Sequence, residues 1–281
     1  MNGFILIDKP KGITSFTVCN KIRKILNLDK TGHNGTLDPN ATGLMVVACN
    51  KATKLMRLIN EHDKEYIATI IFGKTSDTLD VDGNVTDGIL KDFNMEDLID
   101  KINILKKVEE QIPPMTSAIK INGKKLYEYQ KKGIEIELEK RKIKINDIEL
   151  LEYNEDLHEC KIRLNVSKGF YVRSFARDLG KLLNSDAIIS DLRRTKIDNL
   201  DVKDAKSIDD LNIDDIIPID KYFNFPKIEV NDYIAKLVKN GVTLDERQTN
   251  IDGIFFVTNK CDIIAIYEKI ENNKYKPILI L

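Results

Sequence analysis

Residues 31–43 read TGHNGTLDPNATG and lie between a predicted helix and the continuous apolar run of residues 44–48. The three glycines of this stretch allow the backbone to turn tightly or to approach a ligand closely. Pro39 restricts Asp38 to extended conformations, which narrows the orientation of the Asp38 carboxylate. A carboxylate on a stiffened loop beside a strand suits a nucleophile or a general base. The alternative is an Asp-Pro turn that merely connects two elements, because short motifs often match by chance.

The arrangement of hydrophobic residues around this stretch indicates both strands and helices. Residues 3–7 and 44–48 are apolar runs typical of buried strands, and alternate residues of 66–72 are apolar, as on a half-buried strand. Apolar residues recur every three or four positions in 15–26 and 172–183, which predicts amphipathic helices. Further helices are expected at 51–59 and near 95–102, and further strands near 143–151 and 161–166. Because strands and helices mix without a regular alternation, the predicted fold class is α+β.

Two segments stand apart from this pattern. Residues 112–144 contain Pro-Pro and then a Lys-rich run with weak periodicity, which indicates an exposed excursion from the core. Residues 196–221 hold eight Asp and four Lys, and with the Phe-Pro pair at 225–226 they mark a domain boundary. We therefore expect a main domain at 1–225 and a small, mostly β, C-terminal domain at 226–281.

Charge is segregated along the chain although the net charge is only −1. Residues 1–60 and 161–196 each carry nine Lys and Arg against three Asp and Glu, and residues 120–144 carry nine against four. A nearly neutral chain with segregated charge can present a basic face to phosphates. Ordinary solvated surface remains the alternative for any one segment, but three basic segments together favour an anionic partner.

The cysteines and the amino-terminal residues exclude several classes of protein. The four cysteines are scattered without a Cys-x-x-Cys pair, so we expect free thiols and neither a disulfide framework nor a structural metal site. Residues 1–9 contain a short apolar run interrupted by charge, which does not fit a signal peptide. No stretch is apolar over the length that a membrane span requires. The expected location is the cytoplasm.

A resemblance to a known family adds to this interpretation. Residues 32–43, GHxGTLDPxATG, resemble the catalytic signature of the TruB family of bacterial tRNA pseudouridine-55 synthases. Seven further segments resemble family motifs and follow in family order: DKPKGITS at 8–15, ATK at 52–54, DKEY at 63–66, GKTSDTLD at 73–80, IPPMTSA at 112–118, SKGFYVR at 167–173 and LRR at 192–194. As a set these motifs are specific, and they extend over residues 3–196. Past residue 225 the resemblance thins, and the tail is short for a PUA domain.

The resemblance implies a fold and a reaction. The fold would be that of pseudouridine synthases, with a central mixed, mostly antiparallel sheet flanked by helices and a shortened, PUA-like C-terminal domain. Asp38 would be the nucleophile, or the base, that starts cleavage of a uridine's glycosidic bond, after which the uracil rejoins the ribose through carbon 5. No cofactor or metal would be needed. The target uridine at position 55 of the tRNA T-arm loop would be flipped out of its stack to be reached.

Further site residues are implied by the same resemblance. Tyr66 would stack on the flipped base, although an inward-facing strand residue is the plain alternative. Arg173 would pair with Asp38 and lower its pKa, which keeps the carboxylate ionised; a phosphate contact or a surface cation is the alternative. Tyr171 and Leu192 would wall the pocket, with core packing as an alternative for Leu192.

The resemblance also implies roles for His33 and Lys54. His33 would help to hold the rearranged RNA loop, although a lone histidine is more often structural. Lys54 would support the pocket or touch a phosphate.

The basic excursion resembles the family's RNA-gripping insertion, at about 112–144. Its lysines would contact phosphates, which gives affinity without sequence information, while the shape of the RNA gives selectivity. These contacts are assigned to Lys120, Lys124, Lys125, Lys131 and Lys132. The implied partner is the tRNA T-arm stem-loop, and the protein would act as a monomer, without a guide RNA and without a membrane.

Three other functions compete with this interpretation. Residues 80–85, DVDGNV, resemble the Asp-x-Asp motif of metal-dependent phosphatases, but that motif should follow a buried apolar strand and residues 73–78 are polar. A non-catalytic RNA-binding or tRNA-chaperone protein could keep the fold, although the presence of Asp38 counts against it. A guide-RNA-dependent relative shares the Asp loop, but the inserted basic segment and the lack of long basic extensions favour the stand-alone form.

Overall fold

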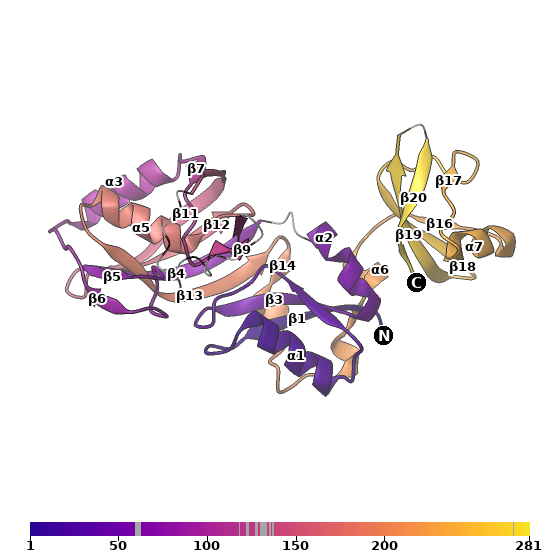
Figure 1. Cartoon of the computed structure of the whole chain (residues 1–281), viewed down its shortest axis with the longest axis horizontal. Helices are drawn as coiled ribbons and strands as arrows, with labels where there is room; N and C mark the ends of the chain where they lie inside the picture. The colour runs from indigo at the N-terminus through magenta and orange to yellow at the C-terminus, as the bar shows by residue number, and fades with distance from the viewer. Residues whose placement is uncertain are drawn as a thin grey trace.

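The structure is a computed structural model of the chain. Figure 1 shows a large body of sheet and helices that runs from the N-terminus, and a smaller curled sheet at the C-terminus. The structure describes residues 1–59, 63–117, 119–121, 124–126, 129, 134, 136, 138–271 and 273–281.

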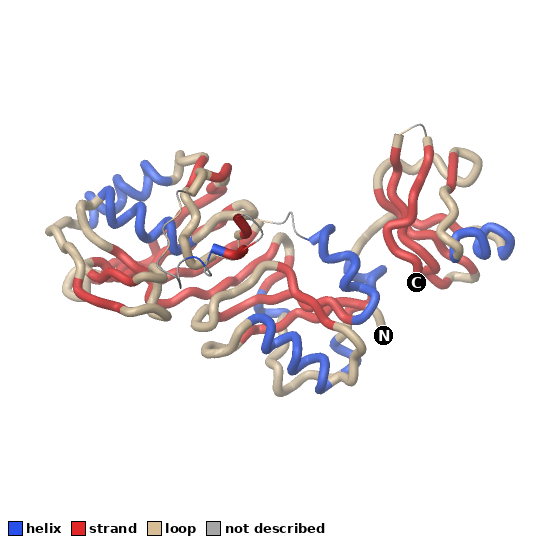
Figure 2. The backbone as a smooth tube through the Cα atoms, in the orientation of Figure 1, coloured by secondary structure: helices blue, strands red, loops and turns tan. Residues whose placement is uncertain are grey.

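A nine-stranded sheet forms the centre of the large body in the described part of the chain (Figure 2). Its main path runs β11-β12-β4-β13-β3-β1-β15, with β14 paired to β13 and β2 to β3. Only the β13–β3 pair is parallel among the described strands of this sheet, so the predicted mixed, mostly antiparallel sheet is confirmed. The strands are β1 (Gly3–Lys9), β2 (Thr31–Asn34), β3 (Thr42–Cys49), β4 (Lys64–Phe72), β11 (Ile145–Asn154), β12 (Glu159–Val166), β13 (Ala187–Ile197), β14 (Leu200–Asp201) and β15 (Ile217–Pro218).

Strands β1 and β3 are buried on both faces, which explains their continuous apolar runs. Alternate side chains of a strand point to opposite faces of the sheet. Ile5 and Met45 belong to the core cluster that contains the helices α1, α3 and α5, whereas Phe4 and Leu44 belong to a second cluster on the other side. Because both faces are covered, no polar residue alternates along either strand within the core.

The predicted long helices are confirmed. Helix α1 (Ser15–Ile25) begins after Thr14, whose side chain accepts a hydrogen bond from the backbone N–H of Thr17 and caps the helix. Helix α3 (Met95–Leu105) begins with a capping box, and α5 (Val172–Leu182) buries one face against β13.

Residues 51–59 are helical, as predicted, but they do not form a single α-helix. The segment forms a 3-10 helix, η1 (Asn50–Leu55), followed by the short α2 (Met56–Ile59). Asn50 has a positive φ of 54°, and the Thr53 hydroxyl donates to the Asn50 carbonyl. A side-chain bond of this kind competes with the regular helical hydrogen bonds and favours the tighter turn.

The Lys-rich excursion leaves the large body between two short strands that pair with each other. Strand β7 (Glu110–Gln111) is antiparallel to β10 (Arg141–Lys142), so the ends of the excursion meet. Within it, β8 (Lys120–Ile121) pairs with β9 (Lys124–Lys125). A further two-stranded ribbon of β5 (Lys74–Ser76) and β6 (Val85–Asp87) lies elsewhere on the large body.

The C-terminal residues form a separate five-stranded sheet in the order β16-β18-β19-β20-β17, covered by α7 (Figure 1). Phe256 and Ile266 of this sheet join Phe4 and Leu6 in one buried cluster, so the small sheet packs against the large body. The 3-10 turns η2 (Val202–Asp204) and η3 (Ile213–Asp215) and the short helix α6 (Ile219–Tyr222) precede this sheet. The C-terminal sheet and its helix consist of β16 (Lys227–Glu229), α7 (Asp232–Lys239), β17 (Leu244–Asp245), β18 (Ile254–Asn259), β19 (Asp262–Ile270) and β20 (Lys274–Ile280).

Two simpler expectations concern the thiols and the membrane. All four cysteines are free thiols; Cys19, Cys49 and Cys160 are buried and Cys261 is exposed. In the part of the chain that the structure describes, no helix has the length and apolar character to cross a membrane.

Candidate active site

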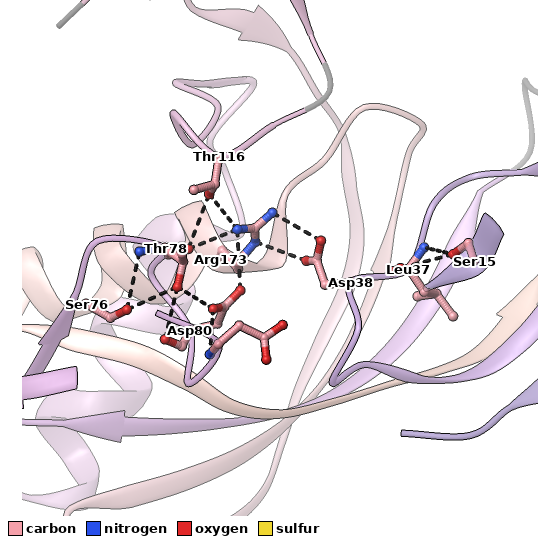
Figure 3. Close-up of polar contacts among 9 residues, drawn as sticks. Ser15, Leu37, Asp38, Ser76, Thr78, Asp80, Thr116 and Arg173 are labelled. Atoms are coloured by element: carbon pink, nitrogen blue, oxygen red, sulfur yellow. Dashed lines mark hydrogen bonds and ion pairs between the residues drawn. The ribbon is translucent and has the colours of Figure 1, made fainter. Parts of the chain in front are cut away.

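Asp38 lies on the loop between β2 and β3, and its carboxylate faces the guanidinium of Arg173 from the first turn of α5 (Figure 3). Arg173 Nε lies 3.2 Å from Asp38 Oδ2, and Arg173 Nη2 lies 3.4 Å from Asp38 Oδ1. The two side chains therefore meet in a side-by-side, two-point pairing, which fixes the plane of the carboxylate. The pairing of these two residues agrees with the sequence expectation.

Arg173 also holds a second carboxylate, that of Asp80. Arg173 Nη1 lies 3.4 Å from Asp80 Oδ2 and donates hydrogen bonds to the Thr78 carbonyl at 2.9 Å and to Thr116 Oγ1 at 2.6 Å. Only 8% of the Arg173 side chain is exposed, so the guanidinium is fixed by neighbours on several sides. One buried cation thus bridges two carboxylates, and the Asp38 side chain is the more exposed of the two, at 37% against 11% for Asp80.

Asp80 is itself fixed by residues next to it in the sequence. Its Oδ1 accepts from Thr78 Oγ1 at 2.5 Å and from the backbone N–H of Asp82 at 3.0 Å. The Thr-x-Asp-x-Asp spacing of residues 78–82 therefore folds into a turn that aims the other oxygen of Asp80 at Arg173. Because Asp80 is engaged by a guanidinium, this geometry also argues against the metal-dependent phosphatase interpretation of the Asp-x-Asp motif.

The pKa of Asp38 is raised above its ordinary value of 3.8. Burial is the largest cause, because a low-dielectric environment disfavours the charged form. Arg173 lowers this pKa as expected, but its effect is smaller than that of burial, and the nearby charges of Asp80 and Asp82 add to the upward shift. The site therefore holds a carboxylate that is less well solvated than an ordinary one.

Lys9 anchors the loop that carries Asp38. The Lys9 side chain is fully buried at the end of β1, and its ammonium donates to the carbonyls of Pro10, Pro39 and Ala41 at 3.0, 2.9 and 2.6 Å. Burial lowers the pKa of Lys9 to about 8, while the charge of Asp38 opposes that shift. The DKP motif of the sequence thus supplies a cation that holds the loop on both sides of Asn40.

Ser15 fixes the same loop from the side of α1. Ser15 Oγ donates to the Leu37 carbonyl at 3.0 Å and accepts from the Leu37 N–H at 2.9 Å (Figure 3). The first residue of α1 is therefore fastened to the residue that precedes Asp38.

Arg194 supports the loop where it enters β3. This side chain is fully buried on β13 and donates to the Leu44 carbonyl at 2.7 Å and to the Gly35 carbonyl at 3.1 Å. Gly43 has a φ of +104°, and a Cβ there would lie 2.2 Å from the Arg194 carbonyl oxygen. Glycine is therefore required at position 43 for β3 to approach β13 this closely.

An open cleft of about 870 Å³ lies over the Asp38 carboxylate. Tyr66 on β4, Tyr171 at the start of α5, Leu192 on β13 and His33 on β2 all line it, so the fold brings together four of the predicted substrate contacts around Asp38. Tyr66 is 9% exposed. Two aromatic rings and a leucine beside a carboxylate provide a surface on which a planar base can stack.

His33 carries a buried polar atom that can serve a ligand. Its Nδ1 has no hydrogen-bond partner among the described residues, and neither has the buried Ser117 Oγ, which lines the same cleft. Burial, followed by the charge of Arg194, lowers the pKa of His33. The imidazole is therefore neutral near pH 7, with a ring nitrogen available to a bound molecule.

The remaining predicted contacts lie elsewhere or cannot be placed. Lys54 is exposed on η1 and is not among the residues that line the cleft, so a pocket-supporting role for Lys54 finds no geometric support. The backbone places Lys120, Lys124 and Lys125 in the β8–β9 ribbon. Lys131 and Lys132 lie outside the described residues.

Sequence reasoning missed several residues that position the site. Lys9 and Ser15 stand in the DKPKGITS motif, and Asp80 stands in the GKTSDTLD motif, so these residues were noted without a role. Thr116 was likewise part of a motif, yet its hydroxyl contacts Arg173. A motif gives proximity in the sequence, whereas these contacts join segments that are far apart along the chain.

Residues 23–172 match the model of the TruB family pseudouridylate synthase N-terminal domain. The chain belongs to the TruB family. The expectation drawn from the sequence motifs is confirmed.

Curated TruB-family proteins match along most of the chain. A protein of Acholeplasma laidlawii named tRNA pseudouridine synthase B is 40% identical over 277 residues, which are 98% of this chain and 98% of that protein. One of the same name from Endomicrobium trichonymphae is 43% identical over 218 residues, or 77% of this chain and 94% of that protein. Among solved structures, a chain in the crystal structure of a Cbf5-Nop10-Gar1 complex is similar with a TM-score of 0.69 and 25% identity, covering 99% of this chain and 83% of that one.

Proposed function

We propose that this protein isomerises uridine to pseudouridine in tRNA, at position 55 in the loop of the T arm, with Asp38 as the catalytic carboxylate. The observation that carries the proposal is the Asp38 carboxylate, which is paired with Arg173 and open to a cleft lined by two tyrosines. Membership of the TruB family and relatives named tRNA pseudouridine synthase B support the reaction and the class of substrate.

The reaction is an isomerisation, so its atoms balance within the substrate. The bond between N1 of the uracil and C1′ of the ribose breaks, and a bond between C5 and C1′ forms. C5 loses a proton and N1 gains one, so no oxidant, reductant or group donor is consumed. A single carboxylate that acts as nucleophile at the sugar or as base can start this sequence.

The raised pKa of Asp38 suits this role. A desolvated carboxylate is more basic and less shielded by water than an exposed one, while the charge of Arg173 favours its ionised form. Lys9 and Ser15 keep the loop in place, so the carboxylate is positioned before the substrate arrives.

Tyr66 and Tyr171 are proposed to receive the flipped base. A uridine inside a folded tRNA loop is stacked and must leave its stack to reach Asp38. Stacking on an aromatic side chain offsets about 1–3 kcal/mol of that loss per base. His33 and the lysines of the excursion are proposed to hold the RNA around the extruded nucleotide, the latter by phosphate contacts.

The test uses the protein alone with an unmodified tRNA transcript. We expect pseudouridine at position 55 and at no other uridine, without any added RNA or protein. A transcript with cytidine at position 55 serves as the matched control and should remain unmodified. Pseudouridine mapping by chemical labelling and primer extension gives the readout.

The competing functions give different results in the same experiment. A non-catalytic RNA-binding protein would bind the transcript without forming pseudouridine, and a guide-dependent enzyme would require an added RNA. Either result would overturn the proposal.

A further inference from the structure

Phe16 is an exposed aromatic side chain at the edge of the catalytic cleft. It is 70% exposed in the first turn of α1, and it lines the same cleft as Asp38 and Tyr66. Among the described aromatic residues, only Phe16 and Tyr233 are exposed to this degree, and Tyr233 lies on α7 in the C-terminal sheet domain. A single exposed phenylalanine is common on a protein surface, but one that lines the cleft over a catalytic carboxylate can contact the substrate.

The surface of α1 around Phe16 matches an RNA in charge. Asn20, Arg23 and Lys24 follow Phe16 at intervals of four, seven and eight residues, so they share its side of the helix. Residues 15–25 contain three basic residues and no acidic residue. The exposed face of α1 therefore runs from an aromatic ring at the cleft to positive charge beyond it, a combination typical of surfaces that bind unpaired nucleotides.

Phe16 is also held at a fixed position relative to Asp38. Its neighbour Ser15 makes two hydrogen bonds with the backbone of Leu37, the residue before Asp38 (Figure 3). Thr14 caps the helix at the same turn. Since side chains on helices are more precisely placed than those on free loops, this ring is pre-organised for a partner that reaches the catalytic loop.

We propose that Phe16 stacks on an unpaired base of the substrate RNA other than the one that reaches Asp38, and so helps to keep the rearranged loop open. The inference rests on the proposed function, because it takes the occupant of the cleft to be a tRNA loop. Tyr66 and Tyr171 receive the extruded uridine, whereas Phe16 stands at the α1 side of the cleft and takes a neighbouring nucleotide.

A tryptophan at position 16 tests the stacking directly, because the chain contains no tryptophan. In Phe16→Trp the indole is the only tryptophan, and stacking on a base quenches its fluorescence. We expect a saturable quench as unmodified tRNA transcript is added. Ile25→Trp is the matched control: it lies on the same helix, is exposed, and follows nine residues later on the opposite side. Its emission should stay nearly constant.

Binding and kinetics give a second measurement. Phe16→Ala should weaken the Kd for tRNA by about 5- to 150-fold, the loss expected when one stacked base loses its aromatic platform. Phe16→Leu should recover only part of the loss, since leucine restores apolar contact but not stacking, and Phe16→Tyr should restore most of it. Ile25→Ala should bind as the wild type does. Thermal unfolding of each variant establishes that the fold is kept.

The outcomes separate this inference from the proposed function. If the wild type modifies the transcript but Phe16→Ala binds it as tightly as Ile25→Ala and the Phe16→Trp variant shows no quench, the stacking role is wrong and the proposed function stands. If the wild type forms no pseudouridine, the proposed function fails, and the quench in Phe16→Trp alone then decides whether Phe16 contacts RNA.

Discussion

The ammonium of Lys9 lies 2.6 Å from the carbonyl oxygen of Ala41, three residues beyond Asp38, and no part of the Lys9 side chain is exposed. A buried cation on three backbone carbonyls is a costly way to hold a loop, because the ammonium must leave water. Burial lowers the pKa of Lys9 to about 8, which reflects that cost. An apolar residue at position 9 would avoid this cost. We therefore infer that Lys9 serves to hold the loop in place.

Lys9→Met should therefore impair both the fold and the catalytic step. Methionine fills a similar volume but leaves the Ala41 carbonyl buried without its donor, at a cost of about 1–3 kcal/mol. We expect a lower Tm and a reduced single-turnover rate at saturating tRNA, with a smaller change in KM. Lys11→Met is the control, because Lys11 is largely exposed and forms a surface ion pair with the equally exposed Asp191. Equal effects of the two substitutions would contradict the anchoring role.

Asp38→Asn should abolish pseudouridine formation and leave the Kd for tRNA within a few-fold of the wild-type value. The amide keeps the shape of the side chain but cannot act as nucleophile or base. Arg173 retains Asp80 as a partner in this variant, so the site should stay folded. Turnover assays and filter binding measure the two quantities, and residual turnover near the wild-type rate would refute the assignment of Asp38.

The raised pKa of Asp38 predicts a pH dependence of stability that Asp38→Asn should remove. A carboxyl whose pKa is higher in the folded state stabilises the fold when protonated, so its contribution is present below the unfolded value and is lost as the pH rises through the folded value. The Tm of Asp38→Asn should therefore rise relative to that of the wild type as the pH increases from about 4. Thermal unfolding across this pH range measures the difference, and a variant Tm that falls relative to the wild type with rising pH would contradict the direction of the shift.

The same shift predicts how the neighbours of Asp38 move the pH profile of catalysis. Arg173 lowers the pKa of Asp38 and Asp80 raises it. Arg173→Met should move the acid limb of the single-turnover rate to higher pH, and Asp80→Asn should move it to lower pH. Rate profiles at saturating tRNA measure both shifts. Shifts in the same direction would show that the two charges do not act through Asp38.

Much of this site could be predicted from the sequence because it is local or carried by a motif. Asp38 stands in a stretch rich in Gly, Asn and Pro beside an apolar strand, which suits a nucleophile or a general base, and the resemblance to the family motif favoured that role over a connecting Asp-Pro turn. The apolar spacing predicted helices α1 and α5, and the alternation of residues 66–72 predicted strand β4, whereas the role of Tyr66 came from the resemblance to the family.

The sequence did not predict strand β13, because apolar and polar residues do not alternate along it. Residues 190–196 read SDLRRTK, which is typical of a surface loop, yet Arg194 is fully buried and satisfied by two carbonyls. The strand also shifts register against β4 at Ile189/Asp191 and at Arg194/Lys196. Each irregularity displaces the inward-facing positions by one residue, so a period of two cannot be read from the sequence.

Activity should persist in excess EDTA with no added cofactor. Arg173 occupies the position between Asp38 and Asp80 that a cation would take if these carboxylates served a metal. The isomerisation also needs no electron or group donor. The assay compares rates with and without chelator on tRNA whose folding is checked under both conditions. A loss that magnesium restores, with the tRNA still folded, would support a metal-dependent site at Asp80 and Asp82.

The Lys-rich excursion should determine how tightly tRNA is held, and this role is separable from the chemistry. Its ends are joined by the β7–β10 pair, and its lysines at 124 and 125 lie on the short strand β9. Each phosphate contact that is lost should reduce the slope of log affinity against log salt by about one unit or slightly less. Replacing Lys124, Lys125, Lys131 and Lys132 by Ala should therefore weaken binding and flatten that slope. The rate at saturating tRNA should fall much less, because Asp38 is unchanged.

The control for this experiment replaces two exposed lysines of helix α7 in the C-terminal domain. Lys236→Ala and Lys239→Ala on α7 remove charge from the C-terminal domain without altering the excursion. If RNA binding depended only on overall charge, this double substitution would flatten the slope as much as the double substitution of Lys124 and Lys125 by Ala in β9. A grip by the excursion predicts a larger change for Lys124 and Lys125, because counterions are released only where phosphates are contacted. Binding isotherms at several salt concentrations decide the matter, and an unaltered slope in the excursion variant would mean that these lysines do not hold the RNA.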